Sequence, residues 1–294
     1  MKTPLLVLLV LASQLSAQQP ASPAKTNAPH SPEINTVLME STFYIQGPSA
    51  RPGEERKNRF GAAFVMLRRA KAESDAGQFV LITAKHVFED IKGDTAILTV
   101  RRRSASGNIE LVPWPINIRS NGKNIYTVHP TADVAAIDIG LPKDSIVAQL
   151  ESMTNINWLA TDEFVNDINL HPGDELLCLG FPLGIQMNGY PVLRSGRIAS
   201  YPVLPLKKVG LLAYDFRVYP GNSGGPVYFS YSDRAHREGL KLGVVYQKVF
   251  GLVTQEASPI ENVDPSLGVI VPSVFIKETI DILAGFESKI KEDF

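Results

Sequence analysis

A single serine, Ser223, stands among glycines in the stretch Pro220-Gly-Asn-Ser-Gly-Gly-Pro226. A serine hydroxyl attacks a carbonyl poorly unless a base removes its proton. Glycine tolerates positive φ, so the turn Gly221-Asn222-Ser223 can point successive amide N–H groups into one concavity. Such a nest stabilises a developing oxyanion, and one donor is worth roughly 3–4 kcal/mol. The stretch therefore indicates acyl-transfer chemistry, although it would also suit a plain glycine-rich turn before a strand.

The pattern G-x-S-x-G also occurs at the nucleophile elbow of α/β-hydrolases, where a strand passes into a helix and the histidine follows the serine. Here the residues from Pro226 to Phe229 predict a continuing strand. The one histidine after Ser223 is His236, which stands in a polar stretch and is expected to be exposed. The base is therefore expected upstream of the serine.

His86 is the best upstream candidate for a general base. It follows the apolar stretch Phe79–Thr83, and a histidine at the end of a buried strand is held rigidly, as a base requires. His30 lies in a linker-like segment, and His129 and His171 each precede a proline in a loop. The alternative for His86 is a structural histidine without chemistry.

Asp133 is the candidate for the carboxylate that orients the imidazole. It heads the apolar stretch Val134–Ile137, where a buried charge is costly unless a partner satisfies it. An imidazole N–H and backbone donors would provide that partner. Asp138 is a rival that more readily faces solvent, and Asp133 could instead cap a turn.

The stretches "LITAKHVF", "HPTADVAAI" and "GNSGGPV" together resemble the three catalytic blocks of the trypsin-like (chymotrypsin-fold, PA clan) serine peptidases. The resemblance is closest to the bacterial HtrA/DegP-related protease domain, and "GDELLCLGFPLG", "SGRIAS" and "VFGLVTQ" extend it. It implies two six-stranded antiparallel β-barrels with the site in the cleft between them. It also implies a triad of His86, Asp133 and Ser223, an oxyanion hole formed by Gly221, Asn222 and Ser223, and no metal or cofactor.

Three departures from that pattern bear on function. Lys85 precedes the histidine, where a small residue is usual. Arg217 stands six residues before Ser223, where trypsin-like enzymes have the floor of the S1 pocket. An inward Arg217 would bind acidic P1 side chains, whereas an outward one would pair with Asp215. We expect no PDZ domain after the peptidase domain, because the residues that follow Ser223 are needed to finish the barrel and the helix.

The elements that must position these residues are mainly short β-like stretches separated by turn residues, which predict an all-β protein. Apolar residues recur every three or four positions between Pro272 and Ile290, which predicts a C-terminal helix. We expect a signal peptide at 1–17, with an uncleaved anchor as the alternative, a flexible linker at 18–35 and a peptidase domain at 36–294. Within that domain, the first barrel spans about 36–150, the second about 171–271 and the helix about 272–290.

The charge balance and the cysteine count limit the possible partners and disulfides. Lys and Arg total 29 against 30 Asp and Glu, so the net charge of −1 favours neither nucleic acid nor anionic membrane as a partner. The basic run Arg101–Arg103 is expected to be a solvated strand end or loop, although it could be a phosphate or partner patch. The single cysteine, Cys178, cannot form an internal disulfide and suits a buried position.

These observations predict a secreted or periplasmic serine endopeptidase that acts on polypeptides and that leaves the membrane once its signal peptide is cleaved. The alternatives are an esterase on the same fold and a catalytically silent scaffold that binds proteins. The sequence leaves the oligomeric state, the physiological substrate and any trigger for activity open.

Overall fold

The computed structural model describes residues 33–54, 56–68, 78–150, 154–232, 235–236, 239–240, 244–254 and 267–292. The expected signal peptide and most of the expected linker lie outside these residues. The described residues, which begin at Glu33, belong to one compact unit. Within the described ranges, no helix combines the length and the apolar character needed to cross a membrane.

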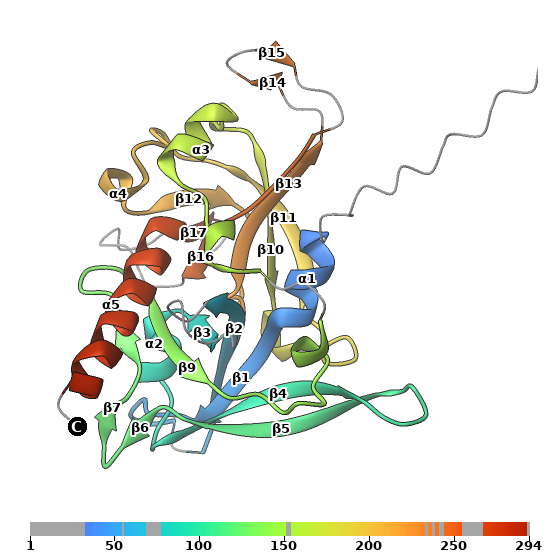
Figure 1. Cartoon of the computed structure of the whole chain (residues 1–294), viewed down its shortest axis with the longest axis vertical. Helices are drawn as coiled ribbons and strands as arrows, with labels where there is room; N and C mark the ends of the chain where they lie inside the picture. Colours follow the sequence, from blue (N-terminus) through green and yellow to red (C-terminus); the bar gives the residue numbers. More distant parts are fainter. Residues whose placement is uncertain are drawn as a thin grey trace, which may run out of the picture. The chain divides into compact units, whose positions relative to one another are not determined.

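The first half of the chain folds into a seven-stranded antiparallel sheet with the order β5-β4-β1-β2-β3-β9-β8 (Figure 1). Its strands are β1 (Thr42–Pro48), β2 (Asn58–Arg68), β3 (Gln78–Thr83), β4 (Thr95–Arg103), β5 (Ile109–Asn117), β8 (Thr127–Val128) and β9 (Ala135–Ile139). A separate small hairpin pairs β6 (Arg119–Ser120) with β7 (Lys123–Asn124). Pro113 and Pro115 have no N–H to donate, which suits the position of β5 at the edge of the sheet.

The second half closes into a six-stranded barrel with the order β10-β11-β12-β17-β16-β13. Its strands are β10 (Glu175–Gly180), β11 (Val192–Ile198), β12 (Leu212–Asp215), β13 (Pro226–Ser232), β16 (Val245–Thr254) and β17 (Leu267–Pro272). The expected chymotrypsin-like all-β architecture is confirmed. One detail differs, because the short β8 adds a seventh strand beside β9 and the first sheet ends in two edges, β5 and β8.

Helix α5 (Ser273–Glu292) is the expected C-terminal helix and joins the two halves. It packs against β8 and β9 of the first half and against β16 and β17 of the second (Figure 1). Its buried residues Ile276, Ile280 and Leu283 recur with helical spacing, as the sequence predicted. The helix therefore covers the junction of the sheets beside the catalytic candidates.

Helix α1 (Ile34–Ser41) was not foreseen, because the sequence favoured a linker as far as residue 35 followed by strand. The Glu33 carboxylate accepts hydrogen bonds from the backbone N–H groups of Asn35 and Thr36, which satisfies two free donors at the helix start. Ile34 and Leu38 are fully buried. Capping and burial of one face thus outweigh the β-branched residues in this segment.

The remaining helical segments and the outer hairpin are short. The α-helical turns are α2 (Lys85–Glu89), α3 (Asp162–Asp167) and α4 (Leu206–Val209). The 3₁₀ turns are η1 (Val147–Gln149), η2 (Ile156–Trp158) and η3 (Pro182–Gly184). A two-stranded hairpin pairs β14 (Ala235–His236) with β15 (Gly239–Leu240).

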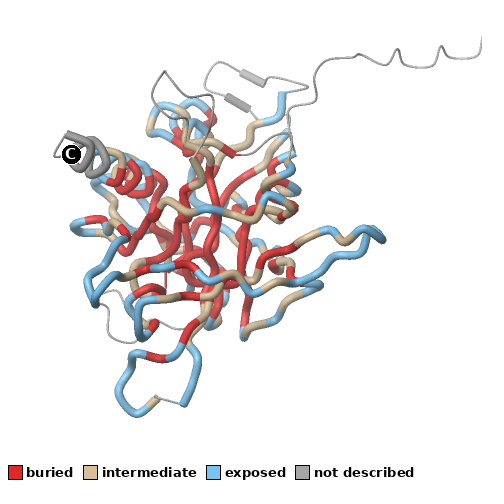
Figure 2. Tube along the Cα trace, turned by 60° about the horizontal axis from the view of Figure 1, so that its bottom comes forward, coloured by how far each residue is buried: buried red, intermediate tan, exposed pale blue. Residues whose placement is uncertain are grey.

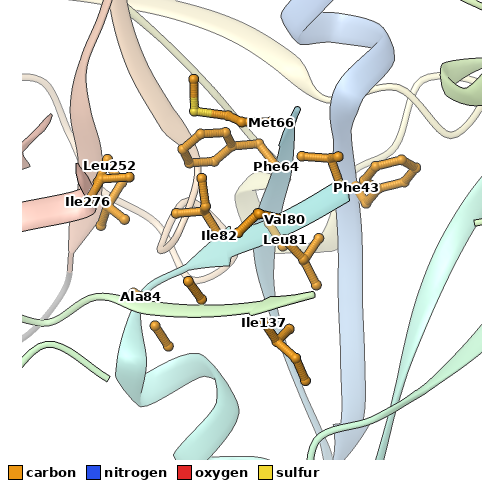
Figure 3. Packing of buried hydrophobic residues seen from close by; sticks show 14 of the residues in the cluster. Phe43, Phe64, Met66, Val80, Leu81, Ile82, Ala84, Ile137, Leu252 and Ile276 are labelled. Atoms are coloured by element: carbon orange, nitrogen blue, oxygen red, sulfur yellow. The ribbon is translucent and has the colours of Figure 1, made fainter. Parts of the chain in front are cut away.

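Buried residues concentrate along the strands of both halves (Figure 2). One apolar cluster includes Phe64 of β2, Ile82 of β3, Leu252 of β16 and Ile276 of α5 (Figure 3). A second cluster fills the closed barrel, with Phe229 and Phe250 among its members. Because the first cluster draws side chains from both halves, apolar packing fixes the position of one sheet against the other.

Arg101 corrects one expectation about the surface. It was expected to be solvated, but it is 1% exposed. Its guanidinium donates to the carbonyl oxygens of Gly189, Glu40 and Thr42 at 2.6, 2.6 and 2.9 Å. It also lies over the ring of Tyr190 at 4.6 Å. Burial lowers the pKa of Arg101 to about 10, so the group stays charged at neutral pH and joins helix α1 to the segment before β11.

Candidate active site

Asp133 is presented by the loop between β8 and β9. The N–H of His129 donates to the carbonyl of Val134 at 3.0 Å and extends the β8–β9 pairing into the loop. Asp133 itself is 3% exposed. A buried carboxylate needs several donors, and the structure provides them from two other elements.

His86 provides two of these donors from helix α2, which follows the buried strand β3 directly. Its backbone N–H donates to Asp133 Oδ1 at 3.0 Å, and its Nδ1 lies 2.7 Å from Asp133 Oδ2. A carboxylate that accepts from Nδ1 fixes the proton there, so the lone pair is at Nε2. The structure thus brings together the expected base and the expected orienting carboxylate.

Thr254, the last residue of β16, provides the third donor. Its hydroxyl donates to Asp133 Oδ2, the same oxygen that faces the imidazole. Burial alone would raise the pKa of Asp133, but the hydrogen bonds from His86 and Thr254 and the attraction of the imidazole lower it below its ordinary value of 3.8. Sequence reasoning missed Thr254, whose one signal was its position at the end of the strand after the serine block.

The loop of Ser223 lies directly against strands β2 and β3. The carbonyl of Ser223 accepts from the N–H of Ala62 at 2.8 Å. A Cβ on Gly224 would lie 2.2 Å from the carbonyl oxygen of Ala62 and 3.0 Å from the nitrogen of Ala84, two residues before His86. The expected nucleophile and the expected base therefore occupy the same region, and glycine at 224 is what permits the approach.

Gly221, two residues before the serine, permits a tight turn. Gly221 has a φ of 97°, and a Cβ there would lie 2.0 Å from the carbonyl oxygen of Phe181. The N–H of Asn222 donates to the carbonyl of Tyr219 at 3.0 Å, so this amide is engaged within the turn. Among the described residues, the N–H groups of Gly221 and Ser223 have no acceptor. Two of the three amides expected in the nest are thus without an acceptor.

The hydroxyl of Ser223 is enclosed in this structure. Ser223 is 3% exposed, and its Oγ has no hydrogen-bond partner among the described groups. The contact between Oγ and the imidazole that acyl transfer requires is therefore not formed here. Catalytic hydrogen bonds are often long or misaligned in enzymes without substrate and tighten when substrate binds.

Arg217 lies two residues beyond the end of β12, which stops at Asp215. Its side chain is exposed, and its guanidinium lies 5.5 Å from the ring centre of Tyr219. Its carbonyl accepts from Arg194 at 2.7 Å. Within the described part of the chain, no ion pair joins Arg217 to Asp215.

Other chemically active groups are separate from this site. Cys178 is buried, and burial raises the pKa of its thiol to about 12, which leaves it protonated and unreactive. His171 is exposed on a loop, and His30 lies outside the described residues. Within the described ranges, no group of three or more His, Cys, Asp or Glu side chains could hold a metal ion.

Comparison with known proteins places these features in context. A family model described as a trypsin-like peptidase domain matches residues 69–232. The fold is similar to that of the protease domain of MamO from Magnetospirillum magneticum, at 15% identity and a TM-score of 0.43, over 83% of this chain and 97% of that chain. It is also similar to the protease Anisep from Arthrobacter nicotinovorans, at 15% identity and a TM-score of 0.47, over 85% of this chain and 97% of that chain.

A third similar structure is the inactivated protease paralogue S-I1 of the scabies mite, at 11% identity and a TM-score of 0.47, over 84% of this chain and 97% of that chain. No curated protein matches the chain in sequence. The structural similarities are distant, so the family assignment depends on the sequence match.

Proposed function

Because the chain belongs to the trypsin-like peptidase family, we propose that it is an exported serine endopeptidase that cleaves polypeptides through an acyl-enzyme on Ser223. The observation that carries the proposal is the buried contact between His86 and Asp133 beside the serine loop, in which the carboxylate accepts one hydrogen bond from the imidazole Nδ1 and one from the backbone N–H of His86. The proton held on Nδ1 leaves the lone pair of the neutral imidazole on Nε2, as a general base requires.

In the proposed reaction, Ser223 Oγ attacks the peptide carbonyl carbon while His86 Nε2 accepts its proton. Asp133 keeps the imidazole in the required tautomer and stabilises the imidazolium that forms. The amides of Gly221 and Ser223 donate to the oxyanion. The proton then passes from Nε2 to the leaving amine, and water repeats the sequence on the acyl-enzyme. The engaged amide of Asn222 supports a two-donor oxyanion hole.

The enclosed hydroxyl of Ser223 sets a requirement for this reaction. Since its Oγ is buried without a partner, substrate entry has to open the surroundings of Ser223 and bring Oγ to Nε2. The same observation favours the second candidate function, a silent scaffold that binds proteins. Chemistry at Ser223 separates the two.

The test uses the mature chain from residue 18 and a fluorophosphonate probe, which forms a covalent bond with an activated serine. We expect labelling of the wild type that is lost in Ser223→Ala and in His86→Ala. Asp133→Asn should lower kcat on a peptide by roughly 10⁴-fold, because it removes the acceptor that fixes the tautomer. His171→Asn is the control, since His171 is exposed and its hydrogen bonds join it to Asp174 and Pro172 instead of to the serine loop.

Each outcome bears on one of the candidates. Absence of labelling between pH 5 and pH 9 would favour the scaffold and reject the peptidase. Labelling with hydrolysis of esters but not of peptides would favour the esterase. Peptide cleavage that falls on acidification would support His86 as a base, because only the neutral imidazole accepts a proton.

Export and substrate preference complete the proposal. Met1-Lys2 followed by the apolar stretch Pro4–Ala12 supports a signal peptide that ends at Ala17, and hence a secreted or periplasmic location. Arg217, exposed and six residues before Ser223, remains the candidate for recognising acidic P1 side chains. Cleavage of a peptide library by the wild type and by Arg217→Ala tests this, and an unchanged P1 preference would reject it.

A further inference from the structure

The loop that carries Asp133 is built around a second histidine. His129 begins the loop and is 7% exposed. Its Nδ1 lies 3.2 Å from the N–H nitrogen of Thr131 and 3.0 Å from that of Ala132, and both N–H groups donate to it. Asp133 follows Ala132 directly in the chain. The imidazole of His129 therefore fixes the two peptide units that lead to Asp133.

These contacts select one tautomer of the His129 imidazole. An Nδ1 that accepts two N–H donors carries a lone pair, so the proton of the neutral ring is on Nε2. Nε2 lies 3.0 Å from Glu278 Oε2 of helix α5 and donates to it. This tautomer is the opposite of the one that Asp133 imposes on His86. A ring protonated at Nδ1 would turn its own N–H toward the N–H groups of Thr131 and Ala132. Three donors would then meet without an acceptor, and the ring could not hold the loop.

Glu278, the partner of His129 Nε2, is itself held in place. Lys207 of α4 donates to Glu278 Oε1 at 2.6 Å, and the ring of Phe275 meets the imidazole edge-on at 5.1 Å. The hydrogen bond from Lys207, which acts against burial, and the one from His129 hold the pKa of Glu278 below its ordinary value, so the carboxylate stays charged. His129 is thus held from α5 while it holds the loop of Asp133.

We propose that His129 is a positioning residue for the reaction: its neutral imidazole, anchored by Glu278, shapes the turn that places Asp133 against His86. The inference deepens the proposed function and depends on it for its kinetic consequence. Its structural part concerns the loop alone and can be measured without activity.

Two substitutions test the contacts of Nδ1 and of Nε2 separately. In His129→Asn the side-chain Oδ1 is as many bonds from the backbone as Nδ1, so it can accept from Thr131 and Ala132 while the contact with Glu278 is lost. In His129→Gln the longer side chain can reach Glu278 but places no acceptor at the position of Nδ1. His171→Asn is the matched control, because His171 also precedes a proline but is exposed.

We expect His129→Gln to lower kcat at least tenfold with KM little changed, and His129→Asn to keep kcat within about threefold of the wild type. The low-field proton resonance of the hydrogen bond between His86 and Asp133 should broaden or disappear in His129→Gln and persist in His129→Asn. His171→Asn should change neither. Full kcat and an unchanged resonance in His129→Gln would overturn the proposal, as would equal losses in both variants that follow their melting temperatures.

A measurement on the wild type keeps the test independent of folding in the variants and of peptidase activity. Ring ¹⁵N shifts should place the proton of His129 on Nε2, and the amides of Thr131 and Ala132 should exchange slowly with solvent. A proton on Nδ1, or fast exchange at both amides, would reject the positioning role even in an active enzyme. If the wild type cleaves nothing but these signals are present, the proposed function fails and the loop architecture stands.

Discussion

Replacing Thr254 by valine removes one hydroxyl from the catalytic candidates and changes little else, because the two side chains have nearly the same shape. In the wild type this hydroxyl donates to Asp133 Oδ2, and both residues are buried, at 1% and 3% exposure. The variant would leave the Asp133 carboxylate with its two donors from His86. We expect losses of both stability and activity, and the stability loss should depend on pH.

The size of the loss follows from the charge on the acceptor. A hydrogen bond to a charged group contributes about 1.5–3 kcal/mol, whereas one between neutral groups contributes about 1 kcal/mol. At pH 7 the carboxylate is ionised, so Thr254→Val should lower the free energy of unfolding by about 2 kcal/mol. The carboxylate also orients His86, so kcat should fall with little change in KM.

The pH dependence follows from the lowered pKa of Asp133. A carboxyl whose pKa is lower in the folded state stabilises the fold above its unfolded pKa, and this stabilisation is lost as the pH falls through the folded value. Removing one of the hydrogen bonds that lower the pKa weakens this contribution. The stability difference between wild type and Thr254→Val should therefore be largest near neutral pH and should shrink as the pH falls below 3.8, the ordinary pKa of the group.

Urea unfolding of both proteins at neutral pH, and at the most acidic pH where both remain folded, measures this difference. Thr279→Val is the matched control, because the buried Thr279 hydroxyl donates to a neutral carbonyl, that of Phe275, at 2.7 Å. Its cost should be about 1 kcal/mol and independent of pH. A loss in Thr254→Val that equals the control at both pH values, or that grows in acid, would refute the assignment of Thr254 as a donor to a charged Asp133.

Three further predictions concern the scaffold. Arg101→Met should lower the free energy of unfolding by about 3 kcal/mol in urea titrations, because the variant leaves buried carbonyl groups without their donor. Arg102→Gln is its control: Asp144, the partner of Arg102, is half exposed, so this variant should change the free energy of unfolding by at most about 0.5 kcal/mol. Gly224→Ala should abolish fluorophosphonate labelling because its Cβ would overlap Ala62 O, whereas Gly285→Ala in α5, with no atom within 4 Å of the added Cβ, should raise the melting temperature. Cys178 should resist a maleimide at pH 8 in the native state and react after unfolding, as expected for a buried thiol with a pKa of about 12.

The residues predicted for the site share a property that sequence can reveal. His86 follows an apolar strand and Asp133 precedes one, so a local hydrophobic pattern marks each as a polar group held at the border of the core. Ser223 is marked by glycines whose backbone geometry other residues would not adopt. The serine loop, the histidine and the carboxylate were therefore predicted from short stretches of sequence, without knowledge of the contacts between them.

Thr254 and Arg101 could not be predicted in this way, because their roles depend on contacts between distant parts of the chain. A threonine at the end of a strand is ordinary, and only the packing of β16 against the loop of Asp133 gives it a buried acceptor. Arg101 shares its run with two other arginines, and the carbonyl groups that surround it come from α1, β1 and the segment before β11. Helix α1 was missed because β-branched residues outweighed a single capping glutamate.

The two halves of the molecule are joined by hydrogen bonds at the site itself as well as by the apolar cluster behind it. The N–H of Ala62 on β2 binds the carbonyl of Ser223, and Thr254 on β16 binds Asp133. The first contact ties the serine loop to the half that carries His86, and the second ties the carboxylate to the barrel that carries the serine. A shift of one half against the other would have to break both. Small motions of the barrels are therefore poorly suited to exposing the enclosed hydroxyl of Ser223. Rearrangement of the side chains around Ser223 would expose it and leave in place the turn whose free amides form the proposed oxyanion hole.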